Sequence, residues 1–214
     1  MLITLSGLDG AGKSTLAEWL RSEIERERRG VTVLHLNDHV GIYAYLRAIR
    51  DRLRGRRPDG PPRMAPHPTG LGRLRDAVVW SGAVRQLLYP VDLLIFLCYR
   101  AVVEKLRGRV LIMDRYFYDT LVDVVAGRAR GVPRWLARLT PSPDLPVFLE
   151  ISPEEAFARK GEYTVQYLRD RDAGYRRVFQ NVRAPLRLSA RELDTAKLAL
   201  ARAVAERLRH ARAA

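Results

Sequence analysis

A segment near the start of the chain has the residue types and spacing of a phosphate-binding loop, G-x-x-x-x-G-K-[ST]: Gly7-Leu8-Asp9-Gly10-Ala11-Gly12-Lys13-Ser14-Thr15. Its glycines allow the backbone to bend so that several N–H groups point at one phosphate, and a helix start after the loop adds partial positive charge. Lys13 could then reach the β- and γ-phosphates of a nucleotide, and the Ser14 hydroxyl could hold Mg²⁺. The segment therefore predicts a nucleotide-phosphate site.

The residues around this loop fit the expected context, which is a strand before it and a helix after it. Residues 2–5 predict a buried strand, and Leu16, Leu20 and Ile24 have the spacing of one helix face. The alternative is a chance match in a glycine-containing turn. The flanking strand and helix favour the phosphate-binding interpretation.

A second candidate element is a buried strand that ends in a carboxylate, Val110-Leu111-Ile112-Met113-Asp114, followed by Arg115. Ligands of open α/β sheets bind at the carboxyl ends of the strands. Asp114 would lie near Lys13 and could hold Mg²⁺ through water, while Arg115 offers planar donors to a phosphate. The alternative is an aspartate that caps the next helix and pairs with Arg115, but the phosphate-binding loop favours the functional interpretation.

Short apolar runs alternate with helical patterns, which predicts an α/β fold with a parallel sheet covered by helices on both faces. Besides residues 2–5, the predicted strands are 31–36, 110–113, 147–149 and 186–188. The length of 214 residues and the lack of an internal repeat predict a single domain, residues 1–214, with a sizeable core.

The helical patterns are interrupted by proline and glycine. Residues 74–88 have helical spacing and Pro90 is expected to stop that helix, with further helices over 92–106 and 192–212. A stretch rich in proline and glycine, residues 55–72, predicts a long loop. Loops of this length are more often functional than idle.

The chain carries a formal net charge of +14, and residues 47–75 alone hold nine arginines against two aspartates. Such a surface could bind nucleic acid or an anionic membrane. No interleaved aromatic residues accompany it, so we favour an arginine-rich background with a site for polyanionic nucleotides. The single cysteine excludes an internal disulfide and suits a reducing cytoplasm. No signal peptide is expected, and the most apolar run, residues 91–99, is too short to span a bilayer as a helix.

Three elements together resemble thymidylate kinase and its relatives among the nucleoside monophosphate kinases: the loop at 7–15, Asp114-Arg115-Tyr116, and the pair Phe96 and Arg100. The resemblance covers most of the chain. It implies a three-layer P-loop NTPase fold with a five-stranded parallel sheet in the order 2-3-1-4-5, an ATP and Mg²⁺ site, and a lid over the phosphates. It also implies transfer of the γ-phosphoryl group to a nucleotide phosphate, by a protein that is usually a homodimer.

The resemblance assigns residues to the phosphoryl acceptor. Asp9 is similar to a family aspartate that faces the acceptor sugar, and Phe96 to the aromatic residue on which the acceptor base stacks. Arg100, one helical turn after Phe96, is similar to an arginine that holds the acceptor, and Arg115 would contact it as well. For Phe96 the alternative is a core residue.

The resemblance also assigns residues to ATP. Some family members stabilise the transferring group with an arginine at the position of Gly10, whereas members with glycine supply the arginine from the lid, here about residues 156–173. The transfer is catalysed mainly by positioning and charge neutralisation. The adenine would rest near Ser189. The lid candidates, each of which could instead be a solvated surface residue, are Arg159, Arg169 and Arg171.

The sequence departs from the family pattern in the acceptor pocket. Where thymidylate kinases have a small hydroxyl residue and a Tyr-Gln pair, this chain has Asp119 and Asp123-Val124. The stretch Leu36-Asn37-Asp38-His39 lacks the arginine that clamps the acceptor phosphate in the family. Two added carboxylates and a missing arginine make the pocket less suited to a phosphate dianion, which leaves the acceptor open.

Three functions follow from these observations. The leading one is an ATP- and Mg²⁺-dependent kinase of a nucleoside monophosphate, such as dTMP. The second is a hydroxyl kinase of a nucleoside, sugar or antibiotic-like metabolite, with Asp38 as general base and Asp119 or Asp123 gripping amino or hydroxyl groups. Asp38 could instead cap a helix over 42–53. The third is a nucleotide-binding module or nucleic-acid-associated ATPase that uses residues 47–75.

Overall fold

The computed structural model describes residues 1–35, 82–125 and 134–213, and its centre is a five-stranded parallel sheet. The strands lie in the order β2-β3-β1-β4-β5, and each neighbouring pair is parallel. The predicted α/β fold with strand order 2-3-1-4-5 is therefore confirmed. The strand bounds are Leu2–Gly7 (β1), Val31–His35 (β2), Val110–Asp114 (β3), Leu145–Glu150 (β4) and Leu186–Ser189 (β5).

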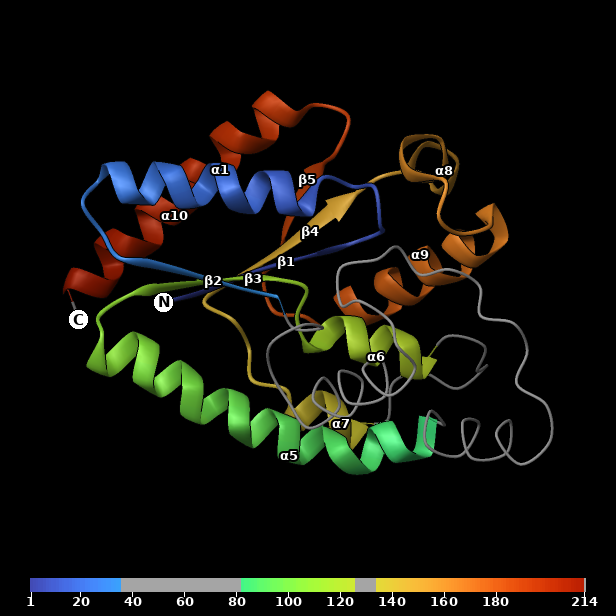
Figure 1. The fold of residues 1–214 in the computed structure, drawn as a ribbon, viewed down its shortest axis with the longest axis horizontal. Helices are drawn as coiled ribbons and strands as arrows, with labels where there is room; N and C mark the ends of the chain where they lie inside the picture. Colours follow the sequence, from blue (N-terminus) through green and yellow to red (C-terminus); the bar gives the residue numbers. More distant parts are fainter. Residues whose placement is uncertain (36–81, 126–133, 214) are drawn as a thin grey trace, which may run out of the picture.

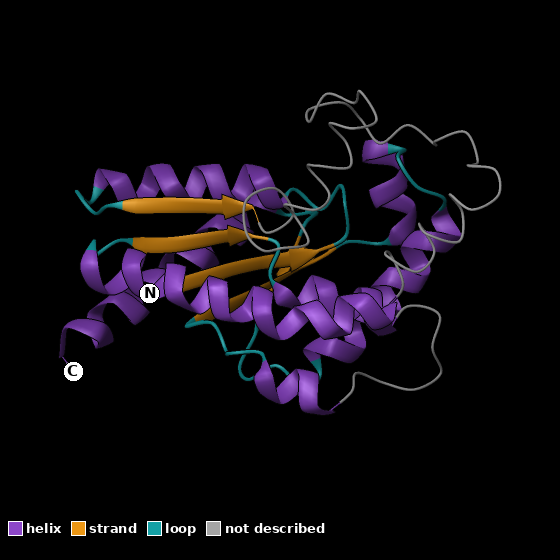
Figure 2. Ribbon diagram, turned by 60° about the horizontal axis from the view of Figure 1, so that its bottom comes forward, coloured by secondary structure: helices purple, strands orange, loops and turns teal. Residues whose placement is uncertain are grey.

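Helices cover both faces of this sheet (Figure 1). On one face lie α1 (Lys13–Arg26) and α10 (Leu193–Ala213), and on the other lie α5 (Gly82–Ala101), α6 (Phe117–Val125) and α7 (Arg134–Leu139). Helix α8 (Pro153–Lys160) lies beyond the tips of the strand arrows (Figure 1 and Figure 2). Helix α9 (Val165–Phe179) runs back from there beside α6, and its Phe179 ring stacks on that of Phe148 in β4. All residues of β1 and β3 are buried, as a sheet between two helical layers requires.

Helix α5 runs through Pro90, so the predicted stop at this residue is wrong. The helix continues as a π-helical turn over Val102–Leu106. Proline removes a backbone donor and clashes with the preceding turn, which costs about 3 kcal/mol. However, Tyr89, Leu93 and Phe96 of this helix are buried. Burial of each such side chain contributes about 1.5–3 kcal/mol, so the buried face outweighs the proline.

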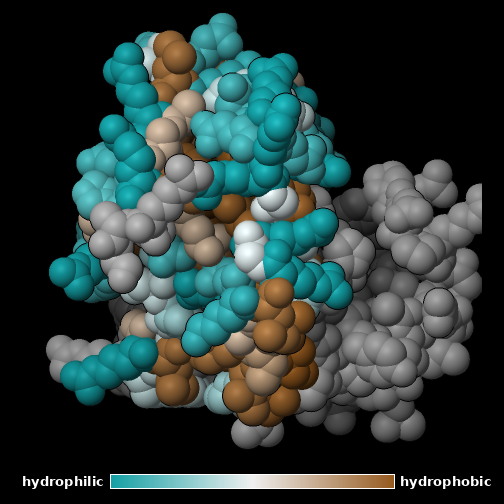
Figure 3. Space-filling view, turned by 90° about the vertical axis from the view of Figure 1, so that its left-hand side faces the viewer, coloured by the Kyte–Doolittle hydropathy of each residue, from teal (hydrophilic) through white to brown (hydrophobic). Residues whose placement is uncertain are grey.

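The face at the amino edge of the sheet is mostly hydrophilic, with hydrophobic residues gathered in one part of it (Figure 3). Along α5 and the turn that follows it, Leu94 and Leu106 are 62% and 80% exposed. Exposed apolar groups can mark interaction surfaces. The homodimer itself stays a prediction. Within the described ranges, every helix is too short or too polar to traverse a membrane.

Asp144 ties together the amino edge of the sheet. Its Oδ2 atom accepts hydrogen bonds from the backbone N–H of Leu2 at 2.6 Å and from Nη2 of Arg100 at 3.0 Å. Arg100 also pairs with Glu104 at 3.1 Å. Since Leu2 opens β1 and Asp144 directly precedes β4, Arg100 lies at the amino edge, whereas the phosphate-binding loop follows the carboxyl end of β1. The structure thus places Arg100 at the edge of the sheet opposite the loop, and its predicted contact with the acceptor stays a prediction.

Asp144→Ala is expected to lower the free energy of unfolding by about 1–3 kcal/mol, because it removes the acceptor of a backbone N–H and of an arginine. Urea unfolding followed by circular dichroism would measure the loss. Glu206→Ala, at an exposed position of α10, is the control. A loss no larger than that of the control would contradict the role of Asp144.

Candidate functional site

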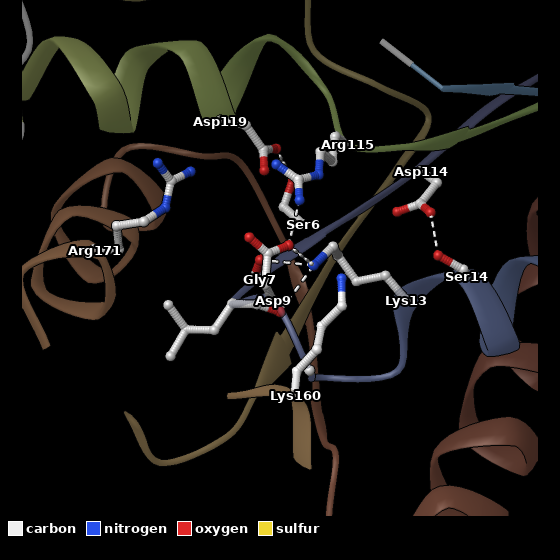
Figure 4. Close-up of polar contacts among 12 residues, drawn as sticks. Ser6, Gly7, Asp9, Lys13, Ser14, Asp114, Arg115, Asp119, Lys160 and Arg171 are labelled. Atoms are coloured by element: carbon white, nitrogen blue, oxygen red, sulfur yellow. Dashed lines mark hydrogen bonds and ion pairs between the residues drawn. The ribbon is translucent and has the colours of Figure 1, made fainter. Parts of the chain in front are cut away.

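The phosphate-binding loop, the end of β3 and the end of α8 surround one cavity of about 300 Å³. Leu5 of β1 lies opposite Asp114 of β3, so both strands deliver their last residues to the same edge of the sheet. Most residues predicted to hold a nucleotide phosphate therefore border one space (Figure 4). The lining residues are Asp9, Gly10, Gly12, Lys13, Ser14, Thr15, Asp114, Arg115, Arg159 and Lys160.

Lys13 is buried at the centre of this site. Its Nζ atom donates to the backbone oxygens of Gly7 at 3.0 Å and Leu8 at 2.8 Å, and it lies 3.7 Å from Oδ1 of Asp9. Burial lowers the pKa of the Lys13 ammonium and the charge of Arg115 lowers it further, against the raising effect of Asp9. The loop thus holds its lysine in place by its own oxygen atoms.

Glycine is required at two positions of the loop by steric contact. A Cβ atom at Gly7 would lie 2.5 Å from the backbone oxygen of Leu149, and one at Gly10 would lie 2.8 Å from that of Ala156 in α8. Gly10 also has a φ of +91°, a backbone conformation that residues other than glycine rarely adopt. Helix α8 therefore packs so closely on the loop that position 10 has no room for an arginine.

Ser14 and Asp114 form a donor set that fits Mg²⁺. The Oγ atom of Ser14 donates to Oδ2 of Asp114 at 2.6 Å, and Asp114 is buried. Hydroxyl and carboxylate oxygens are hard ligands of the kind that Mg²⁺ prefers, and this ion usually keeps several waters besides one or two protein ligands. The structure brings together the two residues predicted to hold the metal.

Asp9 and Arg115 form an ion pair in which Nη2 of Arg115 donates to Oδ1 of Asp9. Arg115 has a φ of +72°, an uncommon conformation for a residue with a side chain and one that occurs at constrained sites. Burial alone would raise the pKa of the Asp9 carboxyl, but the charges of Arg115 and Lys13 hold it below its ordinary value. Burial would lower the pKa of Arg115, whereas Asp9 and Asp119 hold it above its ordinary value.

Arg159 lies between the phosphate-binding loop and the loop after β5. Its Nη2 atom donates to the backbone oxygen of Ala190 at 3.1 Å, and its Nη1 atom donates to that of Gly10 at 3.5 Å. Ala190 directly follows Ser189, the residue predicted to mark the adenine side. Of the three lid candidates, Arg159 is therefore the one that borders both the loop and the predicted adenine side.

The other two lid arginines lie in different surroundings. Arg169 is exposed and pairs with Glu154 at 2.8 Å. Arg171 is 8% exposed, and its guanidinium donates to the hydroxyl groups of Tyr167 at 3.2 Å and Tyr175 at 3.5 Å. Arg171 is also among the charges that hold the pKa of Asp9 down against burial. The structure thus places Arg159 in the lining of the cavity, Arg171 near enough to act on the charge of Asp9, and Arg169 at the surface.

Phe96, predicted to stack on the acceptor base, lies in the core. It is 0% exposed, and its ring centroid lies 5.8 Å from that of Tyr116 and 5.3 Å from that of Phe117. This placement corresponds to the core alternative. Aromatic contacts of this geometry contribute to packing beyond the area that they bury.

Asp119, predicted to grip the acceptor, is engaged inside the protein. It is 6% exposed, and its oxygens accept hydrogen bonds from the Ser6 hydroxyl, the backbone N–H of Tyr116 and the Tyr175 hydroxyl. A carboxylate with these partners and so little exposure fits a role within the protein better than a direct grip on a ligand.

Several predicted features lie outside the described residues: Asp38, the loop at 55–72 and the arginine-rich stretch at 47–75. Asp123 lies in α6, but its side chain is also outside the description. Their roles stay predictions.

Two residues of the site were missed by the sequence analysis. Lys160 lines the cavity, and Ser6 donates to Asp119 at 3.1 Å. Lys160 directly follows Arg159 within the predicted lid, so its position beside a lid candidate could have predicted its place in the site. Ser6 had no signal beyond its place before the first glycine of the loop, because its partner is 113 residues away in the chain.

Comparison with known proteins finds a distant relative. The chain is 31% identical over 167 residues to a thymidylate kinase from Chlorobium luteolum, an alignment that covers 75% of this chain and 66% of that protein. This chain thus spans about two thirds of the length of the relative. The similarity supports a distant relationship to a kinase. No family model matches the chain.

Gly10→Ala is expected to destabilise the protein more than Gly12→Ala. The two glycines have φ values of +91° and +87°, so both substitutions add about 1–2 kcal/mol of backbone strain. Only at Gly10 does the new Cβ atom meet backbone, whereas at Gly12 it meets open space. We expect a further loss of about 1–3 kcal/mol for Gly10→Ala, measured by urea unfolding. Equal losses would contradict the close contact between the loop and α8.

Proposed function

We propose that the protein is an ATP- and Mg²⁺-dependent kinase that transfers the γ-phosphoryl group of ATP to a nucleoside monophosphate, with dTMP or a close relative as the acceptor. The observation that carries the proposal is the convergence of Lys13, the Ser14–Asp114 pair, the Asp9–Arg115 pair and Arg159 on one cavity. The distant relationship to a thymidylate kinase supports nucleotide kinase activity in general.

The loop and Lys13 would hold the phosphates of ATP. Backbone N–H groups at the start of α1 and the Lys13 ammonium supply positive charge there. Ser14 and Asp114 would hold Mg²⁺, which when bound neutralises charge on the β- and γ-phosphates. Arg159 is placed to neutralise charge on the transferring group, because it contacts the loop from the side of Ala190.

Arg115 and Arg171 would bind the acceptor phosphate, with Asp9 orienting Arg115. In the transfer, an oxygen of the acceptor phosphate forms a bond to the γ-phosphorus, the bond from the γ-phosphorus to the bridging oxygen breaks, and ADP leaves. A phosphate oxygen is already charged at neutral pH, so no side chain has to remove a proton. The residues would act by orientation and charge neutralisation.

The hydroxyl-acceptor alternative depends on Asp38 as base and on Asp119 or Asp123 as the residue that grips the acceptor. A hydroxyl kinase benefits from a carboxylate base, and the residue predicted for that role, Asp38, lies outside the described residues. Asp119, predicted to grip such an acceptor, is held by Ser6 and Tyr175. The single domain, the homodimer, the cytoplasmic location and any use of residues 47–75 stay predictions.

Lys13→Ala is expected to lower kcat/KM by at least about 100-fold, because it removes positive charge that acts on the transferring phosphates. The assay mixes ATP, Mg²⁺ and protein with dTMP, other nucleoside monophosphates, nucleosides and amino sugars, and follows ADP and phosphorylated product. Lys105→Ala, at an exposed position after α5, is the control. If only the nucleosides or amino sugars were phosphorylated, the proposed phosphate acceptor would be wrong. Equal effects of Lys13→Ala and Lys105→Ala would contradict the role of Lys13.

Arg159→Gln is expected to lower kcat by about 100-fold and to change the KM for ATP much less, because its charge is needed most when the phosphoryl group is in transit. Steady-state kinetics with saturating acceptor would separate the two constants. Arg21→Gln, at a half-exposed position of α1, is the control. An unchanged kcat would rule out Arg159 as the lid arginine of the transfer.

A further inference from the structure

The carboxylate of Asp119 joins three elements that border the site. Its Oδ2 atom accepts from Oγ of Ser6, in β1, at 3.1 Å and from the backbone N–H of Tyr116, before α6, at 3.1 Å. Its Oδ1 atom accepts from the hydroxyl of Tyr175 in α9. Three donors from three elements need an acceptor with several lone pairs, which a carboxylate provides.

The contact continues from Tyr175 to Arg171 within α9. The two residues are four positions apart, so they lie on the same face of the helix. Nη2 of Arg171 donates to the Tyr175 hydroxyl at 3.5 Å, and the guanidinium lies 5.7 Å from the ring centroids of both Tyr167 and Tyr175. Figure 4 shows the Arg171 side chain extending from α9 on the side where Asp119 and then Arg115 lie. Asp119 is therefore connected to Arg171 through one tyrosine.

Helix α9 is packed tightly on α6 beside this connection. A Cβ atom at Gly174 would lie 2.9 Å from Cγ1 of Val122, so the two helices are as close as a glycine permits. This contact fixes the separation of the helices, and the bond from Tyr175 to Asp119 fixes the rotation of α9 about its axis. The direction of the Arg171 guanidinium follows from both.

The negative charge of Asp119 also acts on the cations of the site. Burial lowers the pKa of Lys13 and Arg115, and Asp119 is one of the carboxylates that raise both values. A neutral side chain at position 119 would remove the negative charge that offsets the effect of burial on Lys13 and Arg115. An amide would also offer one hydrogen-bond-accepting oxygen fewer than the carboxylate.

We propose that Asp119 is a positioning residue that acts through Tyr175 to hold Arg171 at the acceptor side of the site, where Arg171 binds the anionic group of the phosphoryl acceptor. The inference rests on the proposed function and divides the lid arginines between two tasks. Arg159 serves the ATP side from α8, and Arg171 serves the acceptor side from α9.

The test compares Asp119→Asn, Tyr175→Phe, their double variant and Arg171→Gln in the full chain. Asparagine keeps the size of the side chain but cannot accept from all three donors, and phenylalanine removes only the hydroxyl. We expect each variant to raise the KM for the nucleoside monophosphate about tenfold. In Tyr175→Phe and Arg171→Gln, which keep the charge of Asp119, the KM for ATP should change less than about twofold. The double variant should be no worse than either single one, because both changes break one connection.

Hydrogen exchange of the amides of α9 gives a readout that does not depend on activity. Exchange should be faster in Asp119→Asn and Tyr175→Phe than in the wild type, because the anchor of the helix is lost. Arg171→Gln should leave the exchange unchanged while it raises the KM for the acceptor. The control is Arg176→Gln on the same helix, whose side chain is 56% exposed and pairs with Asp172; we expect it to change neither quantity.

Several results would overturn the inference. Unchanged exchange in both anchor variants would show that Asp119 does not hold α9. Equal rises in the two KM values of Tyr175→Phe or Arg171→Gln, or single effects that multiply in the double variant, would indicate a general structural role. An unchanged acceptor KM in Arg171→Gln would remove Arg171 from the acceptor side. In each of these cases the wild-type protein still phosphorylates a nucleoside monophosphate, so only the inference fails. A wild-type protein that phosphorylates no acceptor would contradict both the proposed function and this inference.

Discussion

The parallel pairing of β1 with β3 is the constraint on which the site depends. Leu5 lies opposite Asp114 in this pairing, so the chain enters the loop from β1 at the level where β3 ends, and Ser14 meets Asp114 at 2.6 Å. A shift of the register by one residue would turn Asp114 to the other face of the sheet. Both strands are buried on both sides, so alternation of polar residues cannot set the register. The bond from Leu2 to Asp144 fixes β1 at the opposite edge.

The charges of the site show an excess of positive potential. The pKa of Asp9 is held down by Arg115 and Lys13 although burial alone would raise it, and the pKa of Lys13 is lowered by burial and by Arg115. Four cationic side chains and two carboxylates line the cavity, so cations outnumber carboxylates there. Buried charge of one sign is costly unless it is compensated, and a polyanionic ligand supplies that compensation. The same electrostatics therefore favour a phosphate-rich ligand in this cavity.

The strands and the loop could be predicted because their signals are local. A run of apolar residues before Asp114 and the glycines before Lys13 each specify one short piece of backbone, and the structure has both. Pro90 was misjudged because the burial of residues on α5 outweighs a local penalty. The place of Arg100 at the amino edge was not predicted, because the resemblance rests on its spacing from Phe96 and not on its position along the sheet. Arg100 stands ten positions before Val110, where β3 begins at the amino edge, so the short connection already places it there.

The surroundings of Asp119 could not be predicted, because its partners come from distant parts of the chain. Ser6 is 113 residues away and Tyr175 is 56 residues away, and neither belongs to a motif that names the other. From the sequence alone a carboxylate near the site suggests a ligand contact. The structure shows that its oxygens are already used by the protein, so the composition of a pocket cannot be inferred from residue types without their hydrogen-bond partners.

Gly10 and Arg159 are two parts of one arrangement. Helix α8 packs on the loop so closely that a Cβ atom at position 10 would lie 2.8 Å from the Ala156 backbone, and the last turn of the same helix carries Arg159 to the oxygens of Gly10 and Ala190. A side chain at position 10 would have to move α8 away from the loop and would move Arg159 with it. In the proposed reaction, an arginine that neutralises charge on the transferring group can therefore come from position 10 or from α8, but not from both.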